Sequence, residues 1–554
     1  MSLRDRLVER GKQIARSGVV VRLISNDRVM AVATGIMDAR SRIDAAKAPM
    51  SEALSILLKG HALPNLDPAL EGETEANGVT RQAPPGAPAH GGGNGVALNG
   101  KAHLTASAAS VAPAHGGGGG AGGATAEVAP SAAEQKLATQ MAARTSLSRI
   151  GGRDVFEKCF KFMTADNARA MGVYPFFRPL DFNNGPEAQL EGKKVIMLGS
   201  NNYLGLTTHP RVREAAKAAI DKYGTSMTGS RLVNGTMKLH KELEDKLAAY
   251  HGKEAGLVFT TGYQVNIATI SALLANKKSV AVIDKDDHAS IYDGVRLAQA
   301  AGARMVRYKH NDPAALDQAL TELEAAGHDD GALVCTDGVF SAQGEIVNLP
   351  GMVEVVKRHK ARILVDDAHA LGVIGDKGRG TASHFGLQNE VDLIGGTFSK
   401  SLASIGGWLV GDRKVLDYVQ HFAYSFLFAA SAAPPQVAAA MAALDVMQEE
   451  SWRQDKLREN FTYMRTELRR LGFELGKTET AVIPIYIRDD LKTVMMWKSL
   501  LDDYAIYVNP FITPGVAPKQ QVLRTSYMAT HERVHLDRAL DAFEKVGKKF
   551  GVIP

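Results

Sequence analysis

Lys400 and Asp366 are the residues whose types and positions point most directly to a chemistry. Lys400 follows an apolar run at 391–394, and Asp366 closes an apolar run at 363–365. Such runs are typical of strands in a covered sheet, where ligands bind beyond the carboxyl ends of the strands. A lysine amine can form a Schiff base with a carbonyl cofactor, and a nearby carboxylate can keep a pyridine nitrogen protonated. The pair therefore indicates a pyridoxal site.

Two histidines are expected at the same edge of the sheet. His369 follows Asp366 in the next turn, and His288 follows the apolar run at 280–283. Each residue alone is a weak signal, because a lysine after a strand is usually a solvated loop residue and paired aspartates are often caps or metal ligands. Their combination predicts a site in which one lysine, one carboxylate and two imidazoles serve one cofactor.

These residues need strands to position them, and the sequence supplies a suitable pattern. From about residue 153 to the end, short apolar runs alternate with amphipathic helical stretches. The runs include 195–198, 256–259, 280–283 and 333–335, and the helical stretches include 239–250, 313–326 and 350–359. This alternation predicts an α/β fold with a large, mainly parallel sheet covered on both faces. Beyond Pro434, a helical region and the apolar runs 482–487 and 506–508 predict a smaller C-terminal α/β domain.

Composition divides the rest of the chain. Residues 1–75 have helical spacing and mixed charge, and they form a predicted helical N-terminal extension. Residues 76–130 are rich in Gly, Ala and Pro, so they bury too little apolar surface to offset the entropy of ordering and are expected to be a flexible, disordered linker. Residues 131–554 form the predicted catalytic region.

Two interpretations of residues 1–75 remain open. The segment could be a helical docking module for another protein. It could instead be an amphipathic attachment to the membrane surface, although acids such as Asp5 and Asp27 dilute its basic face. The second interpretation would place the protein peripherally at the inner membrane.

The overall composition excludes several classes of protein. The net charge is +5, from 65 basic and 60 acidic residues, which predicts no nucleic-acid partner. Cys159 and Cys335 are the two cysteines, too few for a disulfide framework or a zinc cluster, and no metal site is predicted. No apolar stretch is long enough to span a membrane, and no signal core opens the chain. We therefore expect a cytoplasmic enzyme.

The region from about Phe156 to the end closely resembles the α-oxoamine synthases, a pyridoxal 5'-phosphate (PLP) family of the fold-type I class. The matching segments are 199–206, 224–225, 229–231, 260–263, 288–290, 336–341, 366–369, 396–400 and 523–524. The segments 380–386, 397–407 and 526–531 are most similar to bacterial members that act on serine. The resemblance implies a PLP-dependent decarboxylative condensation of L-serine with a long-chain acyl-CoA, which gives 3-ketosphinganine, coenzyme A and CO2.

The resemblance also implies roles for the residues around the cofactor. Lys400 would hold PLP as a Schiff base and move the α-proton, and Asp366 would pair with the pyridine nitrogen. His369 would bind the phenolic oxygen, while His288 would stack on the ring and reach the substrate carboxylate. The remaining contacts to PLP would come from Gly262, Tyr263, Ser341 and Thr397.

Each of these remaining residues has a simpler alternative. Gly262 and Tyr263 would offer backbone N–H groups to the phosphate at a helix N-terminus, so the Tyr263 ring could be ordinary packing. Thr397 could add its hydroxyl to the phosphate or cap the chain locally. Ser341 could support the ring hydroxyl or satisfy a turn.

The resemblance implies a substrate site and a partner as well. Arg524 would bind the amino-acid carboxylate as a fork, unless it forms a structural ion pair, and Asn202 would lie near that substrate. The family implies a homodimer with its site at the subunit interface. Relatives usually place Ser or Thr where Ala429 stands, so a hydroxyl contact to the partner's phosphate would be lost.

Two other functions remain open. Another member of the family could condense glycine or alanine with a different acyl thioester, including one linked to a carrier protein. A non-catalytic partner subunit is the remote alternative, because such subunits lack the Schiff-base lysine and this chain has Lys400.

Overall fold

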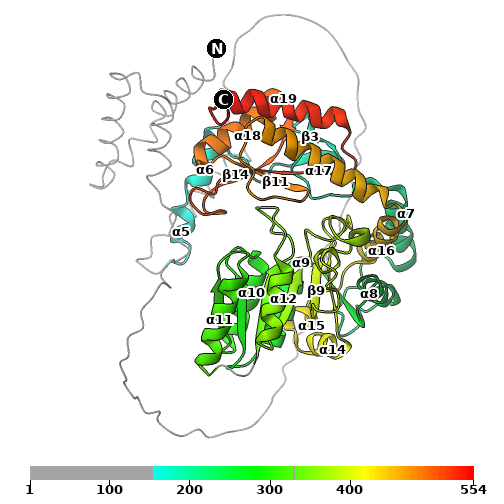
Figure 1. The fold of residues 1–554 in the computed structure, drawn as a ribbon. Helices are drawn as coiled ribbons and strands as arrows, with labels where there is room; N and C mark the ends of the chain where they lie inside the picture. Colours follow the sequence, from blue (N-terminus) through cyan, green and yellow to red (C-terminus); the bar gives the residue numbers. More distant parts are fainter. Residues whose placement is uncertain (1–153, 328–330) are drawn as a thin grey trace, which may run out of the picture. The chain divides into compact units, whose positions relative to one another are not determined.

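The computed structural model describes residues 154–327 and 331–554 (Figure 1). Residues 168–554 within this part belong to one compact unit. Residues 154–167 belong to a second unit, in which α5 (Glu157–Phe160) and the start of α6 (Thr164–Ala170) are helical. The predicted extension at 1–75, the linker at 76–130 and the first residues of the predicted catalytic region lie outside the described residues. Their boundaries therefore remain predictions.

A seven-stranded sheet is the centre of the large part of the main unit. Its strand order is β4-β10-β9-β8-β7-β5-β6. The strands are β4 (Ala255–Phe259), β5 (Val280–Asp284), β6 (Arg304–Tyr308), β7 (Ala332–Asp337), β8 (Arg362–Asp366), β9 (Leu393–Thr397) and β10 (Gly407–Gly411). Only β10 runs antiparallel to its neighbours β4 and β9, while the other pairs are parallel. The prediction of a mainly parallel sheet is confirmed.

Helices cover both faces of this sheet, as the apolar strands require. Val282 and Ile283 are neighbours in β5 but belong to two different apolar clusters, one on each face. The face of Ile283 and Cys335 packs against α9 (Gly262–Leu273), α10 (Ala289–Ala300), α14 (Arg413–Phe422) and α15 (Tyr424–Leu427). The face of Val282 packs against α8 (Lys238–His251), α11 (Pro313–Ala325), α12 (Leu349–Arg358), α13 (Thr381–His384) and α16 (Pro434–Glu449).

A smaller α/β part combines both ends of the main unit. Its antiparallel sheet has the order β11-β14-β13, and a second sheet has the order β1-β2-β3-β12. The strands are β1 (Leu180–Asn184), β2 (Glu187–Leu190), β3 (Lys193–Met197), β11 (Val482–Tyr486), β12 (Ile506–Tyr507), β13 (Asn509–Phe511) and β14 (Val522–Ser526). The remaining helices are η2 (Leu206–Thr208), α7 (Pro210–Tyr223), η3 (Asp376–Gly378), α17 (Trp452–Arg470), α18 (Asp490–Tyr504) and α19 (Arg533–Lys549).

One predicted strand belongs to a different sheet than expected. The apolar run at 195–198 was expected in the alternation of the large sheet, but β3 pairs in parallel with β12, with Ile196 opposite Ile506. Local apolar patterning predicts that a strand exists, whereas its partner is chosen by contacts distant in sequence. In the described part of the chain, no helix combines the length and apolar character needed to cross a membrane.

The strand ends gather polar side chains on one edge of the large sheet. Asp284, Asp337, Asp366 and Thr397 are the last residues of β5, β7, β8 and β9. Because these strands are parallel neighbours, their carboxyl ends lie together. The fold therefore builds a polar site at this edge.

Candidate active site

A cavity of about 310 Å³ lies at the carboxyl ends of the strands. Seven of the residues predicted to bind the cofactor line it: Gly262, Tyr263, His288, Asp366, His369, Thr397 and Lys400. The eighth, Ser341, does not line this cavity, and it contacts Arg524 through its carbonyl instead. The structure thus brings together residues that are widely separated in sequence.

The amine of Lys400 is prepared to act as a nucleophile. Burial lowers the pKa of Lys400 to about 8, although the Asp366 carboxylate opposes this effect, and Arg524 adds to it. A lysine with this pKa is partly neutral near neutral pH, which is the form that attacks a carbonyl. Lys400 also lines a second cavity of about 380 Å³, so its side chain borders both cavities.

Asn266 holds the Asp366 carboxylate in place. Asp366 Oδ2 accepts a hydrogen bond from Asn266 Nδ2 at 2.7 Å, and Oδ1 accepts one from the Ala368 N–H at 2.9 Å. Asn266 is buried in α9, and its Nδ2 also donates to Ser290 Oγ at 2.8 Å. We did not predict Asn266 from the sequence. Its signal was an amide between apolar residues on a helix that follows the segment 260–263.

His288 is the N-cap of α10 and is held by Ser290 in the first turn of that helix. Its Nδ1 accepts the Ser290 N–H at 3.3 Å and lies 2.8 Å from Ser290 Oγ. The Tyr263 ring meets the His288 ring edge to face, with centroids 5.9 Å apart. Desolvation lowers the pKa of His288, Asp366 raises it, and Lys400 lowers it further. His288 therefore presents a neutral imidazole to the cavity.

The first turn of α9 approaches β9 closely at Gly262. A Cβ atom on Gly262 would lie 2.5 Å from Thr397 Cβ, so the position admits only glycine. The N–H groups of this turn lie at the positive end of a helix dipole, where anions bind. Because Gly262 and Tyr263 also line the cavity, this end of the cavity suits a phosphate.

The Thr397 hydroxyl is engaged locally. Its Oγ1 donates to the Gly406 carbonyl at 3.0 Å and accepts the Ser399 N–H at 3.1 Å. These contacts fit the local-capping alternative for Thr397. Ser399 Oγ lies 2.8 Å from Thr397 Oγ1, and Ser399 lines both cavities. Ser399 is therefore an additional hydroxyl at the site that we did not predict from the sequence.

Among the residues that the structure describes, no carboxylate pairs with the buried positive charge of Arg524. Arg524 lies on β14, is 3% exposed, and donates through Nε to the Ser341 carbonyl at 2.6 Å. Its Nη1 and Nη2 both donate to Asn201 Oδ1 at 3.1 Å. None of its contacts within the described residues is an ion pair, so the structural ion-pair alternative finds no support there. A buried charge is costly unless an anion pairs with it.

Asn202 lies beside the second cavity rather than beside Arg524. Its Nδ2 donates to Thr207 Oγ1 at 2.8 Å, and it lines the cavity of about 380 Å³ with Lys400. Asn201, the preceding residue, is the one that contacts Arg524. The segment 199–206 thus places one asparagine at each of two positions around the site.

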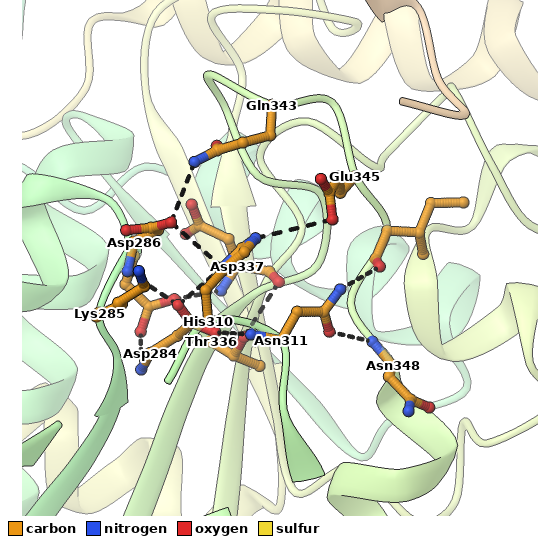
Figure 2. Close-up of polar contacts among 12 residues, drawn as sticks. Asp284, Lys285, Asp286, His310, Asn311, Thr336, Asp337, Gln343, Glu345 and Asn348 are labelled. Atoms are coloured by element: carbon orange, nitrogen blue, oxygen red, sulfur yellow. Dashed lines mark hydrogen bonds and ion pairs between the residues drawn. The ribbon is translucent and has the colours of Figure 1, made fainter. Parts of the chain in front are cut away.

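A polar network lies at the carboxyl ends of β5 and β7, and Figure 2 shows how its side chains converge. Asp284 accepts the Asn311 N–H at 2.6 Å and lies 3.0 Å from His310 Nδ1. Burial alone would lower the pKa of His310, but the hydrogen bond and charge of Asp284, with help from Asp286 and Glu345, raise it. His310 follows β6 and contacts Asp286 and Glu345, so it ties the loops after β5, β6 and β7 together.

Comparison with known proteins agrees with this geometry. Residues 193–543 match the aminotransferase class I and II family. The serine palmitoyltransferase of Sphingobacterium spiritivorum is 44% identical over 393 residues, which cover 71% of this chain and 96% of that protein. The chain belongs to the α-oxoamine synthases. Within this family, the 8-amino-7-oxononanoate synthase of Thermoanaerobacter pseudethanolicus is 38% identical over 388 residues, covering 70% of this chain and 96% of that protein.

Solved structures of this family share the fold. A serine palmitoyltransferase structure with its PLP internal aldimine is 34% identical, has a TM-score of 0.69, and covers 72% of this chain and 100% of its own. The serine palmitoyltransferase of Sphingomonas wittichii is 36% identical with the same TM-score and the same coverage. This α-oxoamine synthase is therefore a fold-type I, PLP-dependent acyltransferase.

The cavity fits PLP. The buried amine of Lys400 suits the aldehyde, the fixed carboxylate of Asp366 suits the pyridine nitrogen, and the Gly262 turn suits the phosphate. These groups come from β8, the loop after β9 and the start of α9, which meet at this edge. The cofactor expectation from the sequence is thus confirmed.

Proposed function

We propose that the enzyme condenses L-serine with a long-chain acyl-CoA to give 3-ketosphinganine, coenzyme A and CO2. The observation that carries this proposal is Arg524, a buried guanidinium without a carboxylate partner in the described part of the chain, near the amine of Lys400. An amino-acid carboxylate is the anion that its fork would bind. The serine palmitoyltransferases at 41–44% identity support serine as that amino acid.

Each residue of the site has a separate role in this reaction. When bound, PLP supplies an electron-withdrawing ring that stabilises negative charge on the α-carbon. Arg524 and His288 hold the serine carboxylate, which directs the α-proton toward Lys400. Lys400 takes this proton and later returns one to the product carbon. Asp366 keeps the pyridine nitrogen protonated throughout.

The acyl thioester needs a route to the same carbon. The second cavity also borders Lys400 and is lined by Ala216, Ala403, Ile405 and Ala439 among others. We propose that the thioester enters here, with Asn202 at its wall. Coenzyme A leaves when the new carbon–carbon bond forms, and CO2 leaves afterward.

The enzyme would act as a homodimer with the site at the interface. Thr260 Oγ1 already donates to the Ala430 carbonyl within one chain, which fixes the segment that contains Ala429 next to the phosphate turn. Because Ala429 has no hydroxyl, we propose that its backbone N–H serves the partner subunit's phosphate.

A second candidate function is condensation of glycine or alanine with another acyl thioester. The 38% identity to 8-amino-7-oxononanoate synthases supports this alternative. Purified protein should be incubated with serine, glycine or alanine, each with palmitoyl-CoA or a shorter thioester, and the product masses measured. We expect the serine and palmitoyl-CoA product to dominate. A dominant product from alanine or glycine would reject serine as the substrate.

A further inference from the structure

Tyr203 connects the two halves of the site in the interior of the protein. It is fully buried after β3, and its hydroxyl lies 2.6 Å from His369 Nδ1. The same hydroxyl lies 3.3 Å from Asn201 Oδ1, which accepts both Nη groups of Arg524. Arg524, Asn201, Tyr203 and His369 therefore form one polar cluster, in which the Tyr203 hydroxyl can donate either to Asn201 Oδ1 or to His369 Nδ1.

The Tyr203 hydroxyl has one proton and two neighbouring acceptors. Burial raises the pKa of Tyr203 to about 12, so the proton is present at neutral pH. Asn201 Oδ1 already accepts a hydrogen bond from Arg524, and Ser526 Oγ lies 3.3 Å from the same oxygen. His369 Nδ1 is the nearer and less occupied acceptor. Burial, with Lys400 and Arg524, holds the pKa of His369 well below its usual range, so this imidazole is neutral and can accept.

We propose that Tyr203 is a positioning residue that donates to His369 Nδ1 and thereby fixes the proton of the imidazole on Nε2. A neutral imidazole carries one N–H, so an accepting Nδ1 requires a donating Nε2. His369 lines the cofactor cavity, and Nε2 is the nitrogen left to serve it. This inference rests on the proposed role of His369 as donor to the phenolic oxygen of PLP. Tyr203 would then determine which ring nitrogen of His369 donates to that oxygen.

The test is the pH titration of the visible absorption band of the PLP-loaded protein, without any substrate. Tyr203→Phe keeps the ring but removes the donor, so His369 no longer has a fixed tautomer. If His369 donates less strongly to the phenolic oxygen, more negative charge stays on that oxygen. This charge stabilises the protonated form of the neighbouring Lys400 nitrogen. We expect the apparent pKa of the band to rise by about one unit. An unchanged titration would overturn the proposal.

Tyr527→Phe is the matched control. Tyr527 is also fully buried, but its hydroxyl accepts from Thr525 Oγ1 at 3.1 Å, on the neighbouring β14. We expect this variant to titrate like the wild type. An equal shift in both variants would mean that the effect comes from general packing, and it would also overturn the proposal.

A second measurement on the wild type does not depend on the folding of any tyrosine variant. Solid-state NMR of PLP-loaded protein labelled with 15N-histidine reports which ring nitrogen carries the proton. The signals of His369 are those that disappear in His369→Gln. We expect a protonated Nε2 and a bare Nδ1, and a proton on Nδ1 would overturn the proposal. Neither measurement uses serine or a thioester, so failure of the proposed condensation would be seen separately.

Discussion

The chemistry of this enzyme depends on a lysine whose pKa lies well below the ordinary lysine value. The burial of Lys400 disfavours its ammonium form, while Asp366 limits how far the pKa falls. The same balance acts on His288, whose pKa Asp366 raises and desolvation lowers. One carboxylate thus moderates both bases, and its own position is fixed by Asn266.

The pKa of Lys400 predicts how PLP loading depends on pH. The folded apoprotein has a Lys400 pKa of about 8, lowered from 10.5, so its reactive neutral amine increases as pH rises through 8. The loading rate, followed by visible absorption after mixing apoprotein with PLP, should rise with pH and level off above about pH 9. An inflection near the ordinary lysine value would contradict the lowered pKa.

Arg524→Lys should weaken serine binding while the charge is kept. The lysine ammonium cannot reproduce the planar fork or both contacts to Asn201. We expect the KM for serine to rise about tenfold, which corresponds to about 1.4 kcal/mol, with a smaller change in kcat. Arg488→Lys, at an exposed ion pair with Glu474, is the control and should leave both constants unchanged. An unchanged KM in Arg524→Lys would remove Arg524 from the substrate site.

The residues with distinctive chemistry were predictable from the sequence, whereas the residues that position them were not. Lys400, Asp366, His369 and His288 were all placed at one cavity, as their strand ends predicted. Asn266 reaches Asp366 across 100 residues, and Tyr203 reaches His369 across 166. An asparagine in a helix or a tyrosine in a loop has no local signal of such a contact, because the fold alone creates it.

At the scale of elements, the site depends on the close approach of α9 to β9. Thr261 begins α9 by accepting the Gln264 N–H, and Gly262 lies against Thr397 with no room for a side chain. This approach places the N-terminus of a helix at the same cavity as the Asp366 carboxylate. The element pattern was predictable, but the distance between the elements was not.

Gly262→Ala should weaken PLP binding by displacing the first turn of α9. The new Cβ would overlap Thr397, and such overpacking costs about 1–3 kcal/mol. We expect the dissociation constant of PLP, measured by absorption or fluorescence titration, to rise about tenfold or more. Ser271→Ala changes the same helix away from Thr397 and should bind PLP normally. Wild-type affinity in Gly262→Ala would contradict this account of the phosphate turn.

The β3 strand shows the limit of element prediction. Its apolar residues correctly predicted a strand, but β3 joins β12 near the C-terminus instead of the large sheet. This pairing makes the segment 199–206 leave the smaller part of the unit and enter the site, where it supplies Asn201, Asn202 and Tyr203. The alternation of apolar runs and helical stretches could not predict which strand pairs with β3, because that choice depends on residues far away in the chain. Asn509, for example, donates to the Gly199 carbonyl across 310 residues.

At the scale of the whole molecule, the two parts of the main unit each supply half of the site. The large sheet provides Lys400 and Asp366, and the smaller part provides Arg524 from β14. The serine palmitoyltransferases align over 393–402 residues of this chain, which cover 94–99% of their own length. The catalytic unit is therefore expected to be complete without the first 130 residues.

Deletion of residues 1–130 should leave the condensation intact. We expect the truncated protein to bind PLP with the wild-type absorption spectrum and to keep kcat within about twofold, because a compact domain folds on its own core. Steady-state kinetics with serine and palmitoyl-CoA in detergent-free buffer would measure this. Loss of the cofactor band or of turnover would show that the N-terminal region is part of the catalytic fold.

The Lys400→Ala variant tests most directly whether Lys400 operates a PLP-dependent condensation of serine. The measurement is the amount of product with the mass of 3-ketosphinganine that forms from serine and palmitoyl-CoA in saturating PLP. We predict steady product formation by the wild type and none by Lys400→Ala. Product formation by Lys400→Ala at the wild-type rate, or its absence from the wild type, would contradict the account.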